Sequence, residues 1–253
     1  MAKKQRLDVV MTERGLTPSR SRAQALVIAG KVRVEGEVES KAGTQIAPEA
    51  KIEIETPDHP YVSRGALKLV AALDAFKISP EGLDCLDVGA STGGFTDVLL
   101  ERGARRVIAL DVGRGQLDWR LRTDPRVEVM EEVNARHLDG IALPFAAALA
   151  TVDVSFISLR LVVPPMLTHL QPNAHLVCLV KPQFEAGRAQ VGKGGIVRDE
   201  TVRRETIDRT VHALEDLGLQ LTGLVPSPIR GQKGNLEELA VFRTPADFPG
   251  ATE

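Results

Sequence analysis

Residues 84–94 read DCLDVGASTGG, and this stretch decides the fold. An apolar run ends in a glycine-rich turn, and the helical pattern GFTDVLLERG overlaps its end. Glycines at such a turn allow the backbone to approach a ligand and let the next helix begin close to the sheet. In open α/β sheets, ligands bind beyond the carboxyl ends of the strands. The stretch therefore predicts the first strand of such a sheet, followed by a ligand-binding loop.

The chain beyond residue 64 alternates short apolar runs with helical patterns, which is typical of a doubly wound α/β sheet. Strands are expected within residues 82–89, 105–113, 126–130, 146–153, 174–182, 219–226 and 237–242. Helices are expected within residues 66–76, 94–103, 155–170 and 198–218.

The second expected strand ends at Asp111, 22 residues after Gly89, where an acid can hydrogen-bond to ribose hydroxyls. We therefore expect a cofactor that contains a nucleoside. The loop lacks the G-x-G-x-x-G spacing of dinucleotide binders, because Ser91 stands at the second glycine. This favours S-adenosylmethionine, and Asp87 is placed to approach its charged methionine end. The run GRAQVGKG at 187–194 ends in Gly194 where a P-loop has Ser or Thr, and it does not open a clear helix, so a P-loop is not expected.

Four charged residues stand where expected elements begin or end. Asp153 follows the fourth strand, and Lys181 follows the fifth. Glu237 opens the last strand, and Lys68 lies on the helix before the first. Parallel strands end at one edge of the sheet, so we expect Asp153 and Lys181 side by side near the cofactor. Pro182 has no N–H to donate, so it is expected to end the strand and open a loop there.

The composition is that of an ordinary globular protein, with 43% hydrophobic and 26% charged residues. No apolar run approaches the roughly 18 residues that cross a membrane, and the N-terminus does not resemble a signal peptide. A cytoplasmic location is therefore expected. Cys85 and Cys178 lie in apolar patterns and are expected to be reduced, buried residues. The five histidines show no ligand spacing, so no metal is expected.

The first 33 residues form a basic head with eight Lys/Arg and two Asp/Glu, a local charge of +6, whereas the whole chain carries −2. A basic head on an acidic body suggests a polyanionic partner. Helices are expected within 6–16 and 18–30, with Gly15 ending the first and Ser19 capping the second. Strands are expected within residues 31–40 and 51–55.

Arg20 and Arg22 fall in or near the first turn of the second helix, where a cation opposes the helix dipole. We interpret this placement as a sign of phosphate binding. The patterns divide the chain into a small α+β head at 1–56, a linker at 57–63, an α/β body at 64–245 and a tail at 246–253.

The sequence RLD at 6–8, followed by SRSRAQALVIAGKVRVEG at 19–36, resembles the α-L RNA-binding domain, also known as the S4 type. In that family the second helix and the following ribbon present a basic face to structured RNA. The resemblance covers most of residues 6–54. It implies RNA contacts at Arg6, Arg20, Arg22, Lys31 and Arg33, and Arg64 in the body is a further candidate.

Six motifs of the body, VSRGALKL, DVGASTGGFT, ALDVGRGQL, VDVSFISL, LVKPQFE and GNLE, together resemble the TlyA-type rRNA 2′-O-methyltransferases. That family joins an α-L head to a Rossmann-like, FtsJ-like methyltransferase body that uses S-adenosylmethionine. The resemblance implies a catalytic tetrad of Lys68, Asp153, Lys181 and Glu237, with Glu237 preferred over the adjacent Glu238. It implies cofactor contacts at Gly89, Ser91, Thr92, Gly93, Gly94, Asp111, Asn134 and Asp153, in addition to Asp87.

The function implied is methylation of a ribose 2′-hydroxyl, on a cytidine in ribosomal RNA or a ribosomal subunit. Short segments outside the two units favour a large-subunit target. Lys181 is expected to act as the base or to position the oxygen, while Lys68 and Glu237 hold the ribose. Two alternatives stay open, a non-catalytic RNA-binding assembly factor and a nucleotide-dependent oxidoreductase. Relatives carry the name haemolysin, but no membrane span or long basic amphipathic helix favours pore formation.

Overall fold

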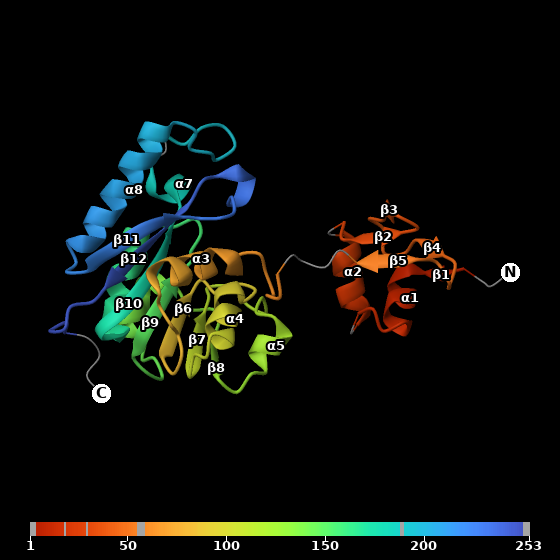
Figure 1. Ribbon diagram of the computed structural model, residues 1–253, viewed down its shortest axis with the longest axis horizontal. Coiled ribbons are helices and arrows are strands. Elements are labelled where there is room, and N and C mark those ends of the chain that lie inside the picture. The colour runs from red at the N-terminus through yellow and green to blue at the C-terminus, as the bar shows by residue number, and fades with distance from the viewer. Residues whose placement is uncertain (1–3, 18, 29, 55–58, 188–189, 250–253) are drawn as a thin grey trace. The chain divides into compact units, whose positions relative to one another are not determined.

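The computed structural model describes residues 4–17, 19–28, 30–54, 59–187 and 190–249. The side chains of Arg22 and Gln232 also lie outside the described part, so the RNA contact expected at Arg22 stays a prediction. The chain folds as two compact units, Met1–Pro60 and Tyr61–Glu253 (Figure 1). No helix in the described part of the chain is long and apolar enough to cross a bilayer.

The first unit packs two helices against two small antiparallel sheets. Leu7, Val10 and Met11 follow the i, i+3, i+4 spacing and are buried in its core with Val27 and Val32. The sheets pair β1 with β4, and β2 with both β3 and β5. The elements are β1 (Gln5–Arg6), α1 (Leu7–Glu13), α2 (Arg20–Ile28), β2 (Val32–Val34), β3 (Glu37–Val38), β4 (Gln45–Ile46) and β5 (Ile52–Ile54).

The turn after α1 forms as expected around a glycine. Gly15 has a φ of +69°, its N–H donates to the Thr12 carbonyl, and the Leu16 N–H donates to the Met11 carbonyl. These two bonds are the Schellman arrangement that satisfies the last carbonyls of a helix. The sequence signal for the end of α1 is therefore confirmed.

The second unit is built on one seven-stranded sheet, and the predicted α/β architecture is confirmed. The spatial order is β11-β12-β10-β9-β6-β7-β8, with parallel pairing from β10 to β8 and β12 antiparallel to both neighbours. The strands are β6 (Asp84–Val88), β7 (Arg106–Leu110), β8 (Val127–Met130), β9 (Ala147–Val152), β10 (Leu170–Val180), β11 (Gln220–Pro226) and β12 (Glu238–Arg243).

Helices cover both faces of this sheet. Their bounds are α3 (Ala66–Phe76), α4 (Gly94–Glu101), α5 (Trp119–Arg122), α6 (Leu159–Met166), α7 (Pro182–Glu185) and α8 (Glu200–Glu215), with 3₁₀ turns η1 (Ala135–Gly140), η2 (Leu167–His169) and η4 (Gln232–Gly234).

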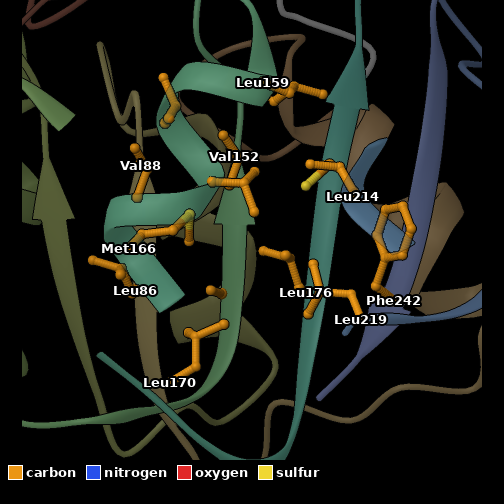
Figure 2. Packing of buried hydrophobic residues seen from close by; sticks show 14 of the residues in the cluster. Leu86, Val88, Val152, Leu159, Met166, Leu170, Leu176, Leu214, Leu219 and Phe242 are labelled. Carbon is orange, nitrogen blue, oxygen red and sulfur yellow. The ribbon is translucent and has the colours of Figure 1, made fainter. Parts of the chain in front are cut away.

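The two faces have separate cores, because side chains along a strand alternate between faces. One core packs α3 and α4 on the sheet and includes Cys85. The other packs α6 and α8 on the opposite face, and Figure 2 shows Leu176 and Phe242 of the strands within it. Cys178 belongs to this second core, so the two cysteines are free, buried residues on opposite faces.

The side on which successive strands are added to the sheet changes at β6. The chain runs from β6 outward through β7 to β8, then returns to place β9 on the other side of β6. The carboxyl ends of β6 and β9 therefore flank the crevice in which doubly wound sheets bind ligands.

Three local expectations differ from the structure. Residues 61–63, expected in the linker, belong to the second unit, where the Val62 N–H donates to Asp97 Oδ2 at 2.8 Å. Pro182 opens the short helix α7 instead of a loop, since proline is tolerated at the first helical position. The expected helix over 155–170 begins only at Leu159, because Ser158 caps it by accepting from the Arg160 N–H.

Candidate active site

The loop after β6 lies directly against the end of β9. Gly89 has a φ of +87°, and a Cβ at this position would lie 2.5 Å from the Asp153 carbonyl oxygen. Neither the backbone conformation nor the space suits a larger residue. The Asp153 N–H donates to the Val88 carbonyl at 2.9 Å, which joins the two strand ends. A glycine is therefore required at position 89 for the loop after β6 to pack this closely against the end of β9.

A cavity of about 520 Å³ opens beside this loop. Asp111 lines it and holds two loops together, accepting from the Ser91 N–H at 2.8 Å and the Gly113 N–H at 2.6 Å. Asn134 also lines the cavity, and its side-chain oxygen caps η1 by accepting from the Arg136 N–H. The structure thus brings the expected residues Gly89, Ser91, Asp111 and Asn134 to one cavity.

Two smaller cavities continue from the first. One of about 120 Å³ is lined by Ser63, Thr92 and Gly94, and it shares Gly89 and Ser91 with the large cavity. The other, of about 210 Å³, shares Ser91 and Asp153 with the second. We call these three the cofactor cavity, the middle cavity and the reaction cavity.

Two lysine–carboxylate pairs line the reaction cavity. Lys68 Nζ lies 2.6 Å from Glu237 Oε2, with both side chains more than nine-tenths buried. Lys181 Nζ lies 2.5 Å from Asp153 Oδ1 and donates to Ser155 Oγ at 3.0 Å. The four residues expected as a tetrad are therefore brought together as two separate ion pairs.

The strand topology explains how residues so distant in sequence meet. Asp153 and Lys181 follow the parallel neighbours β9 and β10, which end at the same edge. Strand β12 runs antiparallel to β10, so its beginning lies at that edge, with Glu238 opposite Val180. Glu237, one residue earlier, reaches the cavity, whereas Glu238 pairs with Arg203 on α8 at 3.2 Å. The geometry therefore favours Glu237 over Glu238 as the cavity carboxylate.

Two of the expected cofactor residues do not reach these cavities. Asp87 is fully buried, and its oxygens accept from the Thr96 and Thr151 hydroxyls at 2.7 and 2.9 Å. Burial raises the pKa of Asp87 to about 6. Gly93 leaves space for the Leu121 side chain, which a Cβ would approach to 2.2 Å. Asp87 supports the loop from beneath and Gly93 serves packing, and direct cofactor contact stays a prediction for both residues.

Sequence reasoning missed several residues of the reaction cavity. Gln183 and Phe184 of α7 line it together with Ser155. Phe156 borders the cofactor cavity, is 85% exposed and has a φ of +63°. The ring centroids of Phe156 and Phe184 lie 5.0 Å apart. A signal was present in the sequence, because each phenylalanine stands three residues after a tetrad residue.

Two cations of the basic head, Arg6 and Arg20, bind a carboxylate within the first unit, which the charge pattern did not predict. Asp8 of α1 is fully buried and accepts from Arg6 at 3.0 Å, Arg20 at 3.2 Å and Gln24 at 2.7 Å. These hydrogen bonds, that of Arg6 first, hold the pKa of Asp8 well below its usual range. The first-turn cation Arg20 therefore has a buried carboxylate as its partner, and its position alone does not require a phosphate.

Three further expected RNA contacts, Lys31, Arg33 and Arg64, lie in the described part of the chain. Arg33 is exposed beside the β2–β3 turn and donates to the Gly36 carbonyl, and Lys31 is half-buried. Arg64 lies in the second unit, where its guanidinium donates to the Arg230 carbonyl at 2.9 Å. The described residues contain no group of three or more His, Cys, Asp or Glu side chains that could hold a metal ion.

Two family models match the chain, one for each unit. The FtsJ-like methyltransferase model matches residues 61–244, and the S4 domain model matches residues 5–52. The larger unit is therefore a methyltransferase, built on the Rossmann-like sheet described above.

Individual relatives identify the family within the methyltransferase class. The chain is 45% identical to the 16S/23S rRNA (cytidine-2′-O)-methyltransferase TlyA of Mycobacterium tuberculosis, over 98% of this chain and 92% of the relative. It is 42% identical to hemolysin A of Brachyspira hyodysenteriae, over 94% and 99%. A solved structure of a candidate hemolysin from Streptococcus thermophilus is 41% identical, with a TM-score of 0.74, over 99% and 92%. The chain belongs to the TlyA family of FtsJ-like methyltransferases.

Proposed function

We propose that this enzyme uses S-adenosylmethionine to methylate the 2′-hydroxyl of a cytidine in ribosomal RNA, with large-subunit RNA as the preferred target. The observation that carries the proposal is continuity between cavities. Ser91 and Asp153 line both the middle cavity and the cavity that holds the two lysine–carboxylate pairs. The name of the Mycobacterium tuberculosis relative supports the same reaction.

The residues present fit S-adenosylmethionine. The cofactor cavity has the size of a nucleoside pocket. Each oxygen of Asp111 accepts one backbone N–H and keeps a further lone pair for a ribose hydroxyl. Asn134 offers a side-chain amide on the same wall, which suits an adenine edge. Ser63 and Thr92 supply hydroxyls in the middle cavity, which suits the polar methionine end.

A ribose hydroxyl is a poor nucleophile at neutral pH. S-adenosylmethionine supplies a methyl group that its sulfonium already activates. The protein must therefore align the hydroxyl oxygen and help to remove its proton. A protonated lysine has three N–H donors, and Lys181 directs two of them to Asp153 and Ser155. The third is available to hold the hydroxyl oxygen in the reaction cavity.

Lys181 serves as the base only in its neutral form. The Lys68–Glu237 pair lies across the same cavity and is assigned to hold the ribose. Either as base or as oxygen holder, Lys181 is the residue nearest the chemistry in this proposal.

The pair formed by Phe156 and Phe184 suits the approach of a nucleotide. Phe156 is an exposed ring between the cofactor cavity and the reaction cavity. Bases taken out of their stack are commonly held against aromatic side chains. The S4 domain would supply the RNA affinity, with Lys31 and Arg33 as candidate contacts.

The test is to incubate the protein and tritiated S-adenosylmethionine with separate small and large ribosomal subunits, and with free ribosomal RNA. We expect label on the 2′-oxygen of a cytidine, in the large subunit first. Label on a base atom, or no label on any of these substrates, would contradict the proposal. Label on the small subunit would extend the target to the two subunits named for the relative.

Lys181→Met tests the role of the lysine without a large change in volume. We expect a rate loss of about 10²–10⁴-fold, the usual contribution of a proton-transfer group, with cofactor binding retained. Lys77→Met is the matched control, because Lys77 is an exposed lysine at the end of α3. A near-normal rate in Lys181→Met would contradict the role assigned to Lys181.

The Lys181→Met variant also distinguishes a methyltransferase from a non-catalytic assembly factor. A non-catalytic assembly factor predicts that cells carrying Lys181→Met mature their ribosomal subunits as the wild type does, and that the purified wild type transfers no methyl group. The oxidoreductase reading is set aside, because the chain belongs to a methyltransferase family. A titration with NAD in place of S-adenosylmethionine should show no binding.

A further inference from the structure

The helix α7 connects the two ion pairs of the reaction cavity. Lys181 is its N-cap residue, and Gln183 is its second residue. Gln183 Nε2 donates to Glu237 Oε1 at 3.2 Å, while the other carboxylate oxygen, Oε2, accepts from Lys68. We propose that Gln183 is a positioning residue, which acts through Glu237 to hold the Lys68–Glu237 pair at a fixed place relative to Lys181. The proposal rests on the methyl-transfer function proposed above.

The orientation of the Gln183 amide follows from its neighbours. With the amide reversed, two acceptor oxygens would face each other at Glu237. In the orientation found, Gln183 Oε1 is buried and has no hydrogen-bond partner among the described residues. A buried acceptor without a partner lowers stability, and an apolar side chain of similar size would avoid that cost. Stability therefore does not explain a glutamine at this position.

The carboxylate of Glu237 is also enclosed from its other side. A Cβ at Gly231 would lie 2.0 Å from Glu237 Oε1 and 2.4 Å from its carboxyl carbon. The backbone of Gly231 and the amide of Gln183 thus confine the same oxygen. The carboxylate can turn away from Lys68 only by breaking its bond to Gln183.

A second contact of α7 fixes the opposite wall of the cavity. Glu185 accepts from the Leu159 N–H at 2.7 Å and from the Ser158 hydroxyl, so α7 is tied to the loop that follows Asp153. Gln183 and Glu185 therefore connect one short helix to the segments that carry Glu237 and Asp153. Supporting hydrogen bonds of this kind control how accurately reacting groups are placed.

The first test compares Gln183→Leu with the wild type in steady-state methyl transfer. We expect kcat to fall by about 10–100-fold, the usual effect of losing a supporting partner. The dissociation constants of S-adenosylhomocysteine and RNA should not change, and the melting temperature should not fall, because the unpaired oxygen is removed. The matched control is Gln220→Leu, an exposed glutamine on β11. An unchanged kcat overturns the proposal, and so does a loss of activity that follows a lower melting temperature.

Gly231→Ala reaches the same carboxylate by steric contact and should give the same kinetic pattern. Its control is Gly140→Ala, since a Cβ at Gly140 meets nothing within 4 Å. Normal kcat in Gly231→Ala would contradict the confinement of Glu237.

A crystal structure of Gln183→Leu gives a readout that does not depend on activity. We expect Glu237 to be displaced from Lys68. An unchanged Lys68–Glu237 pair overturns the positioning role even if the enzyme proves to methylate another substrate. Absence of methyl transfer by the wild type, with the displacement seen, would overturn the proposed function and leave the positioning role supported.

Discussion

The buried carboxylate of Asp87 shows that the place of a residue in the sequence does not determine its surroundings in the fold. It precedes the ligand loop in sequence, yet its oxygens face Thr96 and Thr151 within the protein. Burial disfavours its charged form and raises its pKa to about 6, from an ordinary value of 3.8. The folded protein therefore binds a proton at Asp87 more readily than the unfolded chain does.

The sign of this shift predicts a pH dependence of stability. Between pH 4 and 6 the folded state holds more protons, so the contribution of Asp87 to stability falls as the pH rises. Asp87→Asn removes the charge, and it should raise the free energy of unfolding at pH 7.5 by about 1–3 kcal/mol. Denaturant unfolding at pH 4, 6 and 7.5 measures this. The prediction fails if the variant retains the wild-type slope with pH.

At the scale of elements, Asp8 ties the two helices of the head together. It lies on α1 and accepts hydrogen bonds from Arg20 and Gln24 of α2. Its pKa is lowered, chiefly by the hydrogen bond from Arg6, so its stabilising effect is present above pH 4 and is lost as the pH falls. A cation in the first turn of a helix opposes the helix dipole, and the ion pair with Asp8 offsets this effect for Arg20.

Asp8→Ala should destabilise the first unit by about 1–3 kcal/mol, because the hydrogen bonds from Arg6, Arg20 and Gln24 are lost. The half-exposed arginines regain water, which keeps the loss within this range. Hydrogen exchange of the α1 and α2 amides in the full chain measures the loss. Glu13→Ala is the control, since Glu13 is exposed on the same helix. Equal protection in the two variants would contradict a structural role for Asp8.

At the scale of the whole molecule, an S4 domain is joined to a methyltransferase unit that contains the two lysine–carboxylate pairs. The first 33 residues carry +6 in a chain of net charge −2. Binding to RNA through such a unit releases counterions, so affinity should fall steeply with salt. Because the S4 domain and the reaction cavity lie in different units, affinity for RNA and turnover can be altered separately.

Arg33→Ala should weaken RNA binding and reduce the slope of log affinity against log salt by about one, the effect of losing one phosphate contact. Cofactor binding should not change. Arg204→Ala is the matched control, because Arg204 is an exposed arginine on α8 of the other unit. Filter binding between 50 and 200 mM salt measures both variants, and identical slopes for Arg33→Ala and the wild type would exclude Arg33 as a contact.

The α/β sheet, the ligand loop and the head could be predicted because their signals are local. Apolar runs, periodicity and glycines reveal strands, helices and turns within a few residues. Asp153 and Lys181 were expected together because parallel neighbours end at one edge. The engagement of Arg20 by Asp8 could not be predicted, since it depends on how two helices pack.

The sequence by itself determined the strand–turn–helix units and the residues that stand at their ends. Only the tertiary structure decided how those residues pair. Lys68 meets Glu237 across 169 positions because β12 enters the sheet antiparallel beside β10, and α7 then places Gln183 against the same carboxylate. Asp87 and Gly93 are excluded from the cavities for the same reason, since burial depends on contacts that no local pattern records.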